Sequence, residues 1–313
     1  DWGRCALTGA VLDAATLADV LRRLAEHFPG LELDAAWVEV LRRPQPAYLY
    51  VATNLTGLYA GPSFLAEQLS ELLNGQRLEL LQEQERWCFV RQDDGYLGWA
   101  YRPYLTADPA PVATHIVCEP VSLLRAGPSA AAEPITRVPG GTLLAVQEAA
   151  SAWLKVALAG GPEGWVAAAD LIPLADLPAD EAGRRAHIVA NARRFIGVPY
   201  LWGGCTALGI DCSGFAQLLH RLAGVILPRD ADMQYAAGEP VEPPYRPGDL
   251  LFFGETAGRP KITHVAVSLG GWRIIHSSRS RNGVYEDDVQ AVPHLRESFI
   301  AGRTFVRSAP WTM

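Results

Sequence analysis

The sequence predicts an α+β protein in which two small all-β barrels precede a larger domain that mixes helices and strands. Two observations support this prediction. The part before residue 175 contains a gapless repeat with a period of 66 residues, in which Gly61-Pro62-Ser63 returns as Gly127-Pro128-Ser129 and Trp87 returns as Trp153. The last part of the chain, about 130 residues, combines a helix that has one apolar stripe with several short apolar strands.

The repeat predicts a duplicated small domain. Each copy contains short alternating segments, such as residues 78–81 and 87–90, separated by Gly, Pro and Asp, which is the pattern of a small all-β barrel. Two copies are too few for a solenoid. We therefore expect one barrel at residues 46–108 and a second at residues 112–174.

Residues 1–45 are expected to form a helical extension. One amphipathic helix is evident there, and the breaker Pro29-Gly30 would end it. Its apolar stripe consists of Leu17, Val20, Leu21, Leu24 and Phe28. Such a stripe predicts packing against a neighbouring part of the molecule, and nothing in this segment indicates chemistry.

The chemistry is expected in residues 181–313, where residues 211–215 read Asp-Cys-Ser-Gly-Phe and open a helix. The helical pattern rests on an apolar stripe at i, i+3, i+4 and i+7, formed by Phe215, Leu218, Leu219 and Leu222. Cys212 therefore stands at a helix N-terminus, where the helix dipole and unpaired N–H groups favour a thiolate. We expect Cys212 to be an activated nucleophile.

Two histidines follow on short apolar segments, His264 at the start of one and His276 at the end of the next. To serve one site they must share a face of a hairpin. If they lie directly opposite each other, the loop is Leu269-Gly270-Gly271, whereas a two-residue Gly270-Gly271 turn puts them on opposite faces. The sequence thus predicts the three-residue loop or an equivalent bulge.

Other interpretations of these residues exist. A lone buried cysteine is usually a small hydrophobic residue, and a lone buried histidine is usually part of a core. A zinc site built from Cys205, Cys212, His264 and His276 is conceivable, but the spacings match no zinc template. We therefore expect no metal and no cofactor.

The motifs together resemble those of the NlpC/P60 cysteine peptidases. In order, they are residues 199–204 (Pro-Tyr-Leu-Trp-Gly-Gly), 211–215, 247–250 (Pro-Gly-Asp-Leu), His264-Val265 and His276. The resemblance implies a papain-like catalytic domain in which Cys212 is the nucleophile, His264 the base and His276 the orienting residue. It also implies that Tyr200 and the backbone N–H of Cys212 hold the oxyanion. The repeated domain is similar to bacterial SH3 domains, and its second copy matches better.

Two SH3-like domains followed by an NlpC/P60 domain resemble the γ-D-glutamyl-L-diamino acid endopeptidases. The resemblance implies cleavage of the γ-D-Glu–diaminopimelate bond in a murein tripeptide or tetrapeptide, with recycling of soluble peptides that carry a free N-terminal L-Ala. Glu67 and Tyr96 of the first barrel would then lie near the substrate amine. The alternatives are a lysin acting on intact cell wall and a non-catalytic wall-binding protein.

Further substrate contacts are implied by motif position at Trp202, Asp211, Ser213 and Asp230. The sequence departs from the family pattern at Ala231, where a serine is common, and this removes a hydroxyl from the amine-binding end. Other roles are open. Glu67 could be a solvated surface charge, as its repeat counterpart Glu133 suggests, and Asp230 could be a turn or cap residue.

Composition limits the partners. The net charge of −7 argues against a nucleic-acid partner, and no apolar run approaches membrane-spanning length. The five cysteines are scattered without a disulfide pattern. No signal peptide is visible, and the chain starts at Asp1. We expect a cytoplasmic protein, or a periplasmic or secreted one if a leader has been removed.

Overall fold

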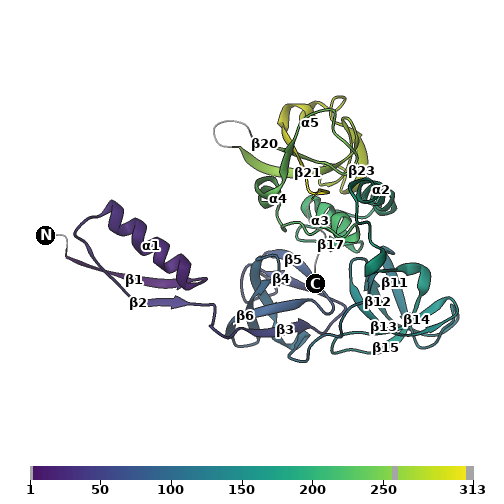
Figure 1. Ribbon diagram of the computed structural model, residues 1–313, viewed down its shortest axis with the longest axis horizontal. Coiled ribbons are helices and arrows are strands. Elements are labelled where there is room, and N and C mark those ends of the chain that lie inside the picture. Colours follow the sequence, from purple (N-terminus) through teal and green to yellow (C-terminus); the bar gives the residue numbers. More distant parts are fainter. Residues whose placement is uncertain (1–2, 256–259, 308–313) are drawn as a thin grey trace.

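The structure, a computed structural model, describes residues 3–255 and 260–307. The predicted domains 1–45 and 181–313 therefore lie partly outside the described residues. The mixed domain sits above two barrels, and a fourth, N-terminal unit extends away from them (Figure 1). Within the described residues, no helix is long and apolar enough to cross a membrane.

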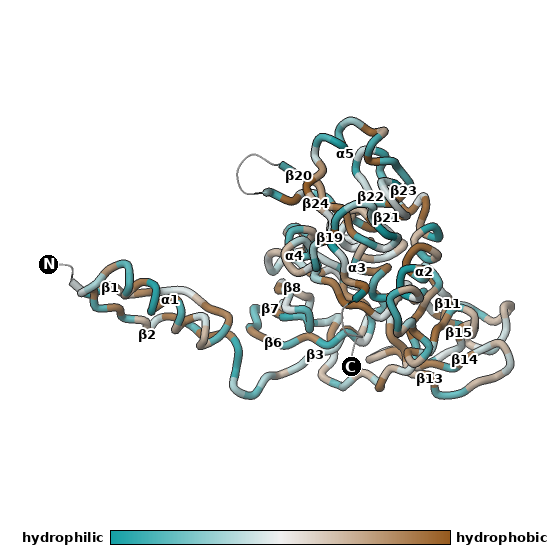
Figure 2. The backbone as a smooth tube through the Cα atoms, turned by 45° about the horizontal axis from the view of Figure 1, so that its top comes forward, coloured by the Kyte–Doolittle hydropathy of each residue, from teal (hydrophilic) through white to brown (hydrophobic). Residues whose placement is uncertain are grey.

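The N-terminal unit is a βαβ unit: it contains the predicted helix and, in addition, two strands that were not predicted. Strands β1 (Arg4–Val11) and β2 (Glu32–Val40) pair in parallel and flank helix α1 (Ala14–His27). Asp13 caps α1 by accepting a hydrogen bond from the Thr16 N–H at 2.8 Å. The strands contain half-buried and exposed residues but no buried one. The unit lies apart from the other domains in both views (Figures 1 and 2).

The first barrel is a seven-stranded antiparallel sheet with the order β5-β4-β8-β7-β6-β3-β9. Alternating residues point into its core, as Leu49 and Val51 of β3 illustrate. Its elements are β3 (Ala47–Val51), β4 (Leu55–Tyr59), β5 (Gln68–Leu73), β6 (Arg77–Gln84), β7 (Trp87–Gln92), β8 (Leu97–Tyr101), the 3₁₀ helix η1 (Arg102–Tyr104) and β9 (Leu105–Thr106).

The second barrel repeats this topology. Its order, β12-β11-β15-β14-β13-β10-β16, matches that of the first barrel strand for strand. Its elements are β10 (His115–Val117), β11 (Val121–Arg125), β12 (Pro134–Pro139), β13 (Leu143–Ala150), β14 (Trp153–Ala157), β15 (Glu163–Ala167), η2 (Ala168–Asp170) and β16 (Leu171–Pro173). The 66-residue sequence repeat is therefore a repeat of one fold.

The third domain packs helices against a sheet with the order β19-β24-β20-β21-β22-β23. The 3₁₀ helix η3 (Leu174–Asp176) precedes it. Its elements are α2 (Glu181–Ala192), η4 (Arg193–Phe195), β17 (Cys205–Thr206), β18 (Gly209–Ile210), α3 (Cys212–Leu222), α4 (Ala231–Ala237), β19 (Glu239–Val241), β20 (Leu250–Glu255), β21 (Lys261–Gly270), β22 (Arg273–Ser278), β23 (Gly283–Asp288), α5 (Pro293–Ser298) and β24 (Phe299–Thr304). The predicted α+β class is confirmed.

The core of this domain fixes α3 on the sheet. The predicted apolar stripe of α3 is buried: Phe215, Leu218, Leu219 and Leu222 are each at most 3% exposed. They join Phe252 and Val265 of the neighbouring strands β20 and β21 in one cluster. Burying four such side chains stabilises the helix by several kcal/mol, at about 1.5–3 kcal/mol each. The first turn of α3 is thereby held at a fixed position on the sheet.

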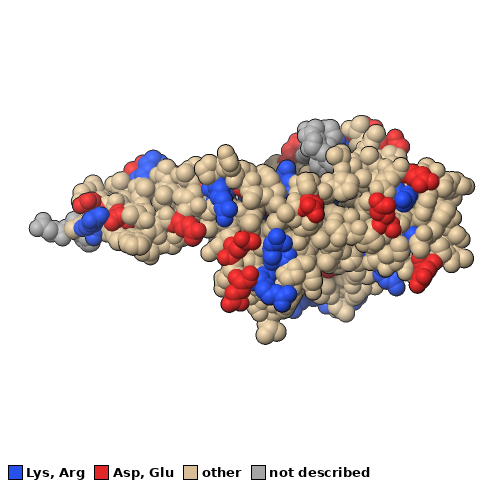
Figure 3. All heavy atoms as spheres, turned by 90° about the horizontal axis from the view of Figure 1, so that it is seen from below, with Lys and Arg blue, Asp and Glu red and all other residues tan. Residues whose placement is uncertain are grey.

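Hydrogen bonds also join the domains. Asn74 of the first barrel exchanges two hydrogen bonds with the Ala159 backbone of the second, at 3.1 and 2.9 Å. Arg221 of α3 donates to the Gly141 carbonyl of the second barrel at 2.9 Å. The mixed domain therefore rests on both barrels. Acidic and basic residues are interspersed on the face seen in Figure 3.

Candidate active site

Cys212 is the first residue of α3, and its position is set by the residues around it. Asp211 caps the helix by accepting from the Gly214 N–H at 2.7 Å. Gly214 permits a close approach, because a Cβ there would lie 2.2 Å from the Gly204 carbonyl oxygen. The backbone N–H of Val265 in β21 donates toward the Cys212 sulfur. The thiol thus lies where α3 meets the strand that carries His264.

The pKa of the Cys212 thiol is raised, whereas the position at a helix N-terminus predicts a lowered pKa. Burial and the adjacent Asp211 carboxylate raise the pKa of the thiol to about 12, although the N–H groups of Val265 and Ser213 act in the opposite sense. Burial and Asp211 thus oppose the thiolate that the helix N-terminus favours, and the activated thiol stays a prediction.

The two histidines share one face of a hairpin, as predicted, but not through the predicted loop. Val267 pairs with Ile275, so His276 lies diagonal to His264 rather than opposite it. The turn is Gly271-Trp272, and a bulge at Leu269 supplies the extra residue that keeps both rings on one face. Of the two predicted alternatives, the structure therefore has the bulge and not the Leu269-Gly270-Gly271 loop.

A third group completes this chain of side chains. His264 Nε2 lies 2.7 Å from His276 Nδ1, and His276 Nε2 lies 3.2 Å from the Asp287 carboxylate. Asp287 comes from β23, the strand beside β22. Its pKa is lowered, because hydrogen bonds from His276 and Arg281 outweigh the opposite effect of burial, so it is a carboxylate.

The Asp287 carboxylate determines the tautomers of the His276 and His264 rings. We assign the His276 proton to Nε2, facing Asp287, because a carboxylate can only accept. His276 Nδ1 is then an acceptor, so His264 must donate from Nε2. This leaves His264 Nδ1 as a bare nitrogen, available to take the proton of Cys212. Burial and the neighbouring His276 lower the pKa of His264 to about 3, so the ring is neutral before reaction.

Tyr200 lies close enough to interact with Cys212. Burial, together with the proximity of Cys212 and Asp211, raises the pKa of the Tyr200 phenol. The hydroxyl therefore keeps its proton at neutral pH and can donate. The Cys212 N–H lies in the first turn of α3, where backbone N–H groups have no hydrogen-bond partner within the helix. Both donors needed by an oxyanion are thus available beside the thiol.

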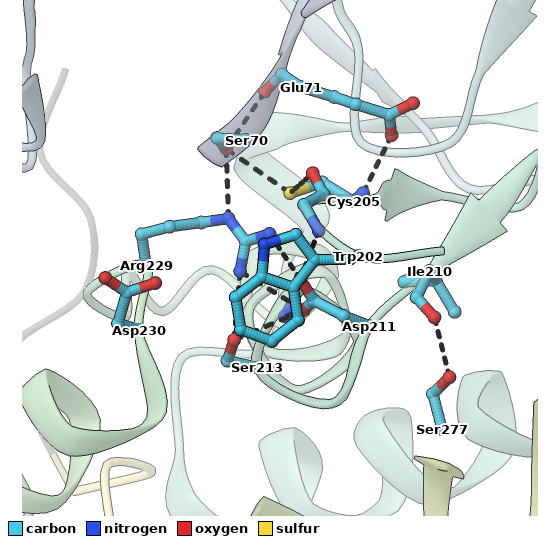
Figure 4. A network of polar contacts seen from close by, with 12 residues as sticks. Ser70, Glu71, Trp202, Cys205, Ile210, Asp211, Ser213, Arg229, Asp230 and Ser277 are labelled. Atoms are coloured by element: carbon cyan, nitrogen blue, oxygen red, sulfur yellow. Dashed lines mark hydrogen bonds and ion pairs between the residues drawn. The ribbon is translucent and has the colours of Figure 1, made fainter. Parts of the chain in front are cut away.

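Asp211 and Ser213 belong to a buried network around Arg229, whose side chain is 1% exposed (Figure 4). Arg229 bonds both carboxylate oxygens of Asp211, at 2.6 and 3.2 Å, and the Ser213 hydroxyl at 2.9 Å. Its Nε donates to the hydroxyl of Ser70 in the first barrel at 3.0 Å. Asp211 also accepts from the Gly203 N–H at 2.9 Å. Asp211 and Ser213 thus position the start of α3. Their contact with substrate stays a prediction.

The remaining predicted residues form two pairs, each with one member from the first barrel. The Trp202 indole donates to Glu67 at 2.8 Å, and the Tyr96 hydroxyl donates to Asp230 at 2.9 Å. Burial raises the pKa of Asp230, although the Tyr96 hydroxyl and the nearby Arg229 guanidinium act in the opposite sense. Asp230 stands at the N-cap of α4, but its side chain forms no cap hydrogen bond.

The sequence reasoning identified both histidines but not Asp287. The signal was present: residue 287 is two positions beyond Tyr285, which pairs with His276, so it lies on the face of the histidines.

Cys205 is turned toward the first barrel, where its sulfur lies 3.5 Å from the Ser70 hydroxyl. No group of three or more potential metal ligands occurs among residues 3–255 and 260–307.

Comparisons with known proteins agree with this geometry. The NlpC/P60 family profile matches residues 197–303, and the bacterial SH3 domain profile matches residues 53–106 and 123–172. Dipeptidyl-peptidase 6 of Lysinibacillus sphaericus is 32% identical over 250 residues, which are 75% of this chain and 89% of that protein. The chain belongs to the NlpC/P60 family. It is a cysteine peptidase with two bacterial SH3 domains.

Two further relatives fit this NlpC/P60 assignment. The γ-D-glutamyl-L-lysine dipeptidyl-peptidase of Bacillus cereus is 28% identical over 232 residues, which are 69% of this chain and 68% of that protein. A crystal structure of an NlpC/P60 family protein from Bacillus cereus superimposes with a TM-score of 0.73 at 22% identity, covering 83% of this chain and 99% of that one. The latter similarity extends the shared fold to both barrels.

For an NlpC/P60 peptidase with a neutral Cys–His pair, we expect a wide pH optimum. Reaction requires His264 unprotonated and Cys212 protonated. The lowered His264 pKa moves the acidic limb of kcat/KM below 6.5, and the raised Cys212 pKa moves the basic limb above 9. Inactivation by iodoacetamide should accelerate up to at least pH 9. A plateau of inactivation between pH 5 and 8, with the rate of a free thiolate, would show a preformed ion pair instead.

Replacement of Asp287 by Asn should lower kcat about 10- to 100-fold with little change in KM, because an amide can donate to His276 Nε2 and reverse both tautomers. The acidic limb of the pH profile should move as well, which loss of packing alone does not cause. The matched control is Glu286→Gln on the same strand, which contacts Arg193 and Arg273 instead. Unchanged kcat in Asp287→Asn would show that Asp287 does not set the tautomers of the two histidines.

Proposed function

We propose that the protein hydrolyses the γ-D-Glu–diamino acid bond of murein peptides that begin with a free L-Ala. The reaction class follows from the Cys212–His264–His276 arrangement and from family membership. The substrate class is supported by two relatives whose names specify γ-D-glutamyl-L-lysine dipeptidyl-peptidases. Enzymes that release dipeptides act next to a free N-terminus.

The observation that carries the proposal is the Tyr96–Asp230 pair. The Asp230 carboxylate is half-buried and has a raised pKa, and the neutral Tyr96 hydroxyl is its hydrogen-bond partner. A substrate ammonium would add a directly bonded positive partner, in a charge-assisted hydrogen bond. Glu67 adds a second carboxylate from the first barrel. An acylated, glycan-linked N-terminus carries no charge and would leave the carboxylates without a counter-ion.

The chemistry proceeds in two steps. His264 Nδ1 takes the thiol proton as the Cys212 sulfur attacks the γ-carbonyl carbon, and Tyr200 with the Cys212 N–H stabilises the oxyanion. His264 then gives its proton to the departing amine, which leaves a thioester. Water, deprotonated by His264, hydrolyses the thioester and regenerates the thiol. The positive charge on His264 is stabilised through His276 by Asp287.

The test is to incubate the purified protein with L-Ala-γ-D-Glu-diaminopimelate and, separately, with intact sacculi, and to follow the products by mass spectrometry. We expect L-Ala-D-Glu and diaminopimelate from the free peptide and no soluble peptide from sacculi. Release from sacculi without cleavage of the free peptide would instead support a wall lysin.

A further inference from the structure

Arg281 lies on the turn between β22 and β23 and reaches the carboxylate that completes the chain of histidines. Its Nη2 donates to Oδ1 of Asp287 at 2.6 Å. The other oxygen, Oδ2, lies 3.2 Å from His276 Nε2. Asp287 therefore binds a guanidinium through one oxygen and an imidazole through the other. None of the reaction steps uses Arg281 directly.

The turn that carries Arg281 is anchored beside the active site. The Asn282 N–H closes the turn by donating to the Arg279 carbonyl at 3.2 Å, and Asn282 has a left-handed backbone with φ of 50°. The Asn282 carbonyl accepts from the Tyr200 N–H at 3.3 Å. The backbone around Arg281 is thus tied to the segment that carries the predicted oxyanion residue.

Tyr285 of β23 holds the Arg281 guanidinium in place. The guanidinium carbon lies 3.4 Å from the centroid of the Tyr285 ring, a cation–π contact. The Tyr285 hydroxyl oxygen lies 2.7 Å from the Ser280 hydroxyl oxygen on the same turn, and this hydrogen bond restrains the ring. The ring also packs against His276, with 4.7 Å between the ring centroids. One tyrosine therefore contacts both partners of Asp287.

We propose that Arg281 is a positioning residue for the peptidase reaction, which holds the Asp287 carboxylate so that one oxygen faces His276. The Asp287 side chain is 17% exposed, so water can compete for its oxygens. By occupying Oδ1, Arg281 restricts rotation of the carboxylate and leaves Oδ2 for the imidazole. A planar guanidinium can stack on a ring and donate to a carboxylate at the same time, which an ammonium group does less well.

The tautomers of both histidines depend on this orientation. With Oδ2 facing it, His276 keeps its proton on Nε2 and accepts from His264 through Nδ1. If the carboxylate turned toward solvent, the Nδ1–H tautomer of His276, which cannot accept from His264, would become populated. Burial raises the pKa of Asp287, but hydrogen bonds from His276 and Arg281 outweigh it and keep the group a carboxylate. Arg281 thus supports the bare His264 nitrogen that takes the Cys212 proton.

Arg273 provides a matched control on the same two strands. Its Nη2 lies 2.8 Å from Oε2 of Glu286, the neighbour of Asp287 on β23. The side chains of Arg273 and Arg281 are 62% and 55% exposed, so water reaches both ion pairs to a similar degree. Replacing either arginine by Gln removes one guanidinium from a carboxylate of β23. Only the carboxylate beside Arg281 is bonded to His276.

The test compares the wild type with Arg281→Gln, Arg281→Lys and Arg273→Gln as full chains. Imidazole ¹⁵N NMR at neutral pH reports the tautomer of His276, whose signals are identified by their loss in His276→Gln. We expect the Nε2–H tautomer in the wild type and a second, Nδ1–H population in Arg281→Gln. For L-Ala-γ-D-Glu-diaminopimelate, kcat of Arg281→Gln should fall about 5-fold with little change in KM. Arg281→Lys keeps the charge and should recover part of both, and Arg273→Gln should match the wild type.

The NMR measurement needs no turnover, so it decides the proposal whichever peptide the enzyme cleaves. The proposal is contradicted by an Nδ1–H tautomer in the wild type, or by an unchanged tautomer in Arg281→Gln. Equal effects of Arg281→Gln and Arg273→Gln would show a general effect of charge. A lower kcat together with a lower melting temperature and an unchanged His276 tautomer would show that Arg281 only stabilises the fold.

Discussion

Cys212→Ala should lower kcat for peptide hydrolysis by at least about 10⁴-fold, because it removes the thiol that lies beside the strand carrying His264. The variant should stay folded. Cys212 is only partly buried, and alanine suits the first turn of α3, where Asp211 still provides the cap. The measurement is single-turnover hydrolysis of a free tripeptide, together with circular dichroism melting.

The control for this variant is Cys205→Ala in the same domain. Its sulfur faces the Ser70 hydroxyl at 3.5 Å and Gly203, away from the histidines. It should keep most of the wild-type kcat. Hydrolysis by Cys212→Ala at near the wild-type rate would show that another group is the nucleophile.

Asp230→Asn should lower kcat/KM for a free tripeptide about 30-fold, equivalent to about 2 kcal/mol, because it removes the charge that we propose pairs with the substrate ammonium. Tyr96 can still donate to the amide oxygen, so the local geometry should survive. The same variant should change kcat/KM for an N-acetylated tripeptide very little.

A matched control is Asp232→Asn, two residues further along α4. Its carboxylate accepts from the Met233 N–H and is exposed. It removes one negative charge from the same helix without touching Tyr96. If both variants lowered kcat/KM equally, the effect would be one of overall charge and not of a specific amine site.

Local patterns predicted the parts of the fold that depend on nearby residues. The apolar stripe of α3 and the placement of Cys212 at its start follow from the period of 3.6 residues and the capping Asp211. The duplicated barrels follow from a repeat that preserves turn glycines and two tryptophans per copy. Such features depend only on residues within a few helical turns or one hairpin, so a single stretch of sequence predicts them.

Features set by register or by distant partners could not be read in this way. A bulge at Leu269 makes His264 and His276 diagonal neighbours, and one residue of slip would have separated them. Asp287 joins them only because β23 pairs with β22 in a particular register. The direction of the Cys212 pKa depends on burial by other elements, which outweighs the local helix terminus. Strands β1 and β2 were missed because none of their residues is buried, so they lack the apolar pattern of a core strand.

We propose that a charged N-terminus selects the substrate, and a comparison of two peptides tests this. The measurement is kcat/KM of the wild-type protein for L-Ala-γ-D-Glu-diaminopimelate and for the same peptide with an acetylated amine. Acetylation would delete the proposed ion pair with the half-buried Asp230 carboxylate. We expect kcat/KM to fall by at least about 100-fold. Equal values for the two peptides would contradict the account.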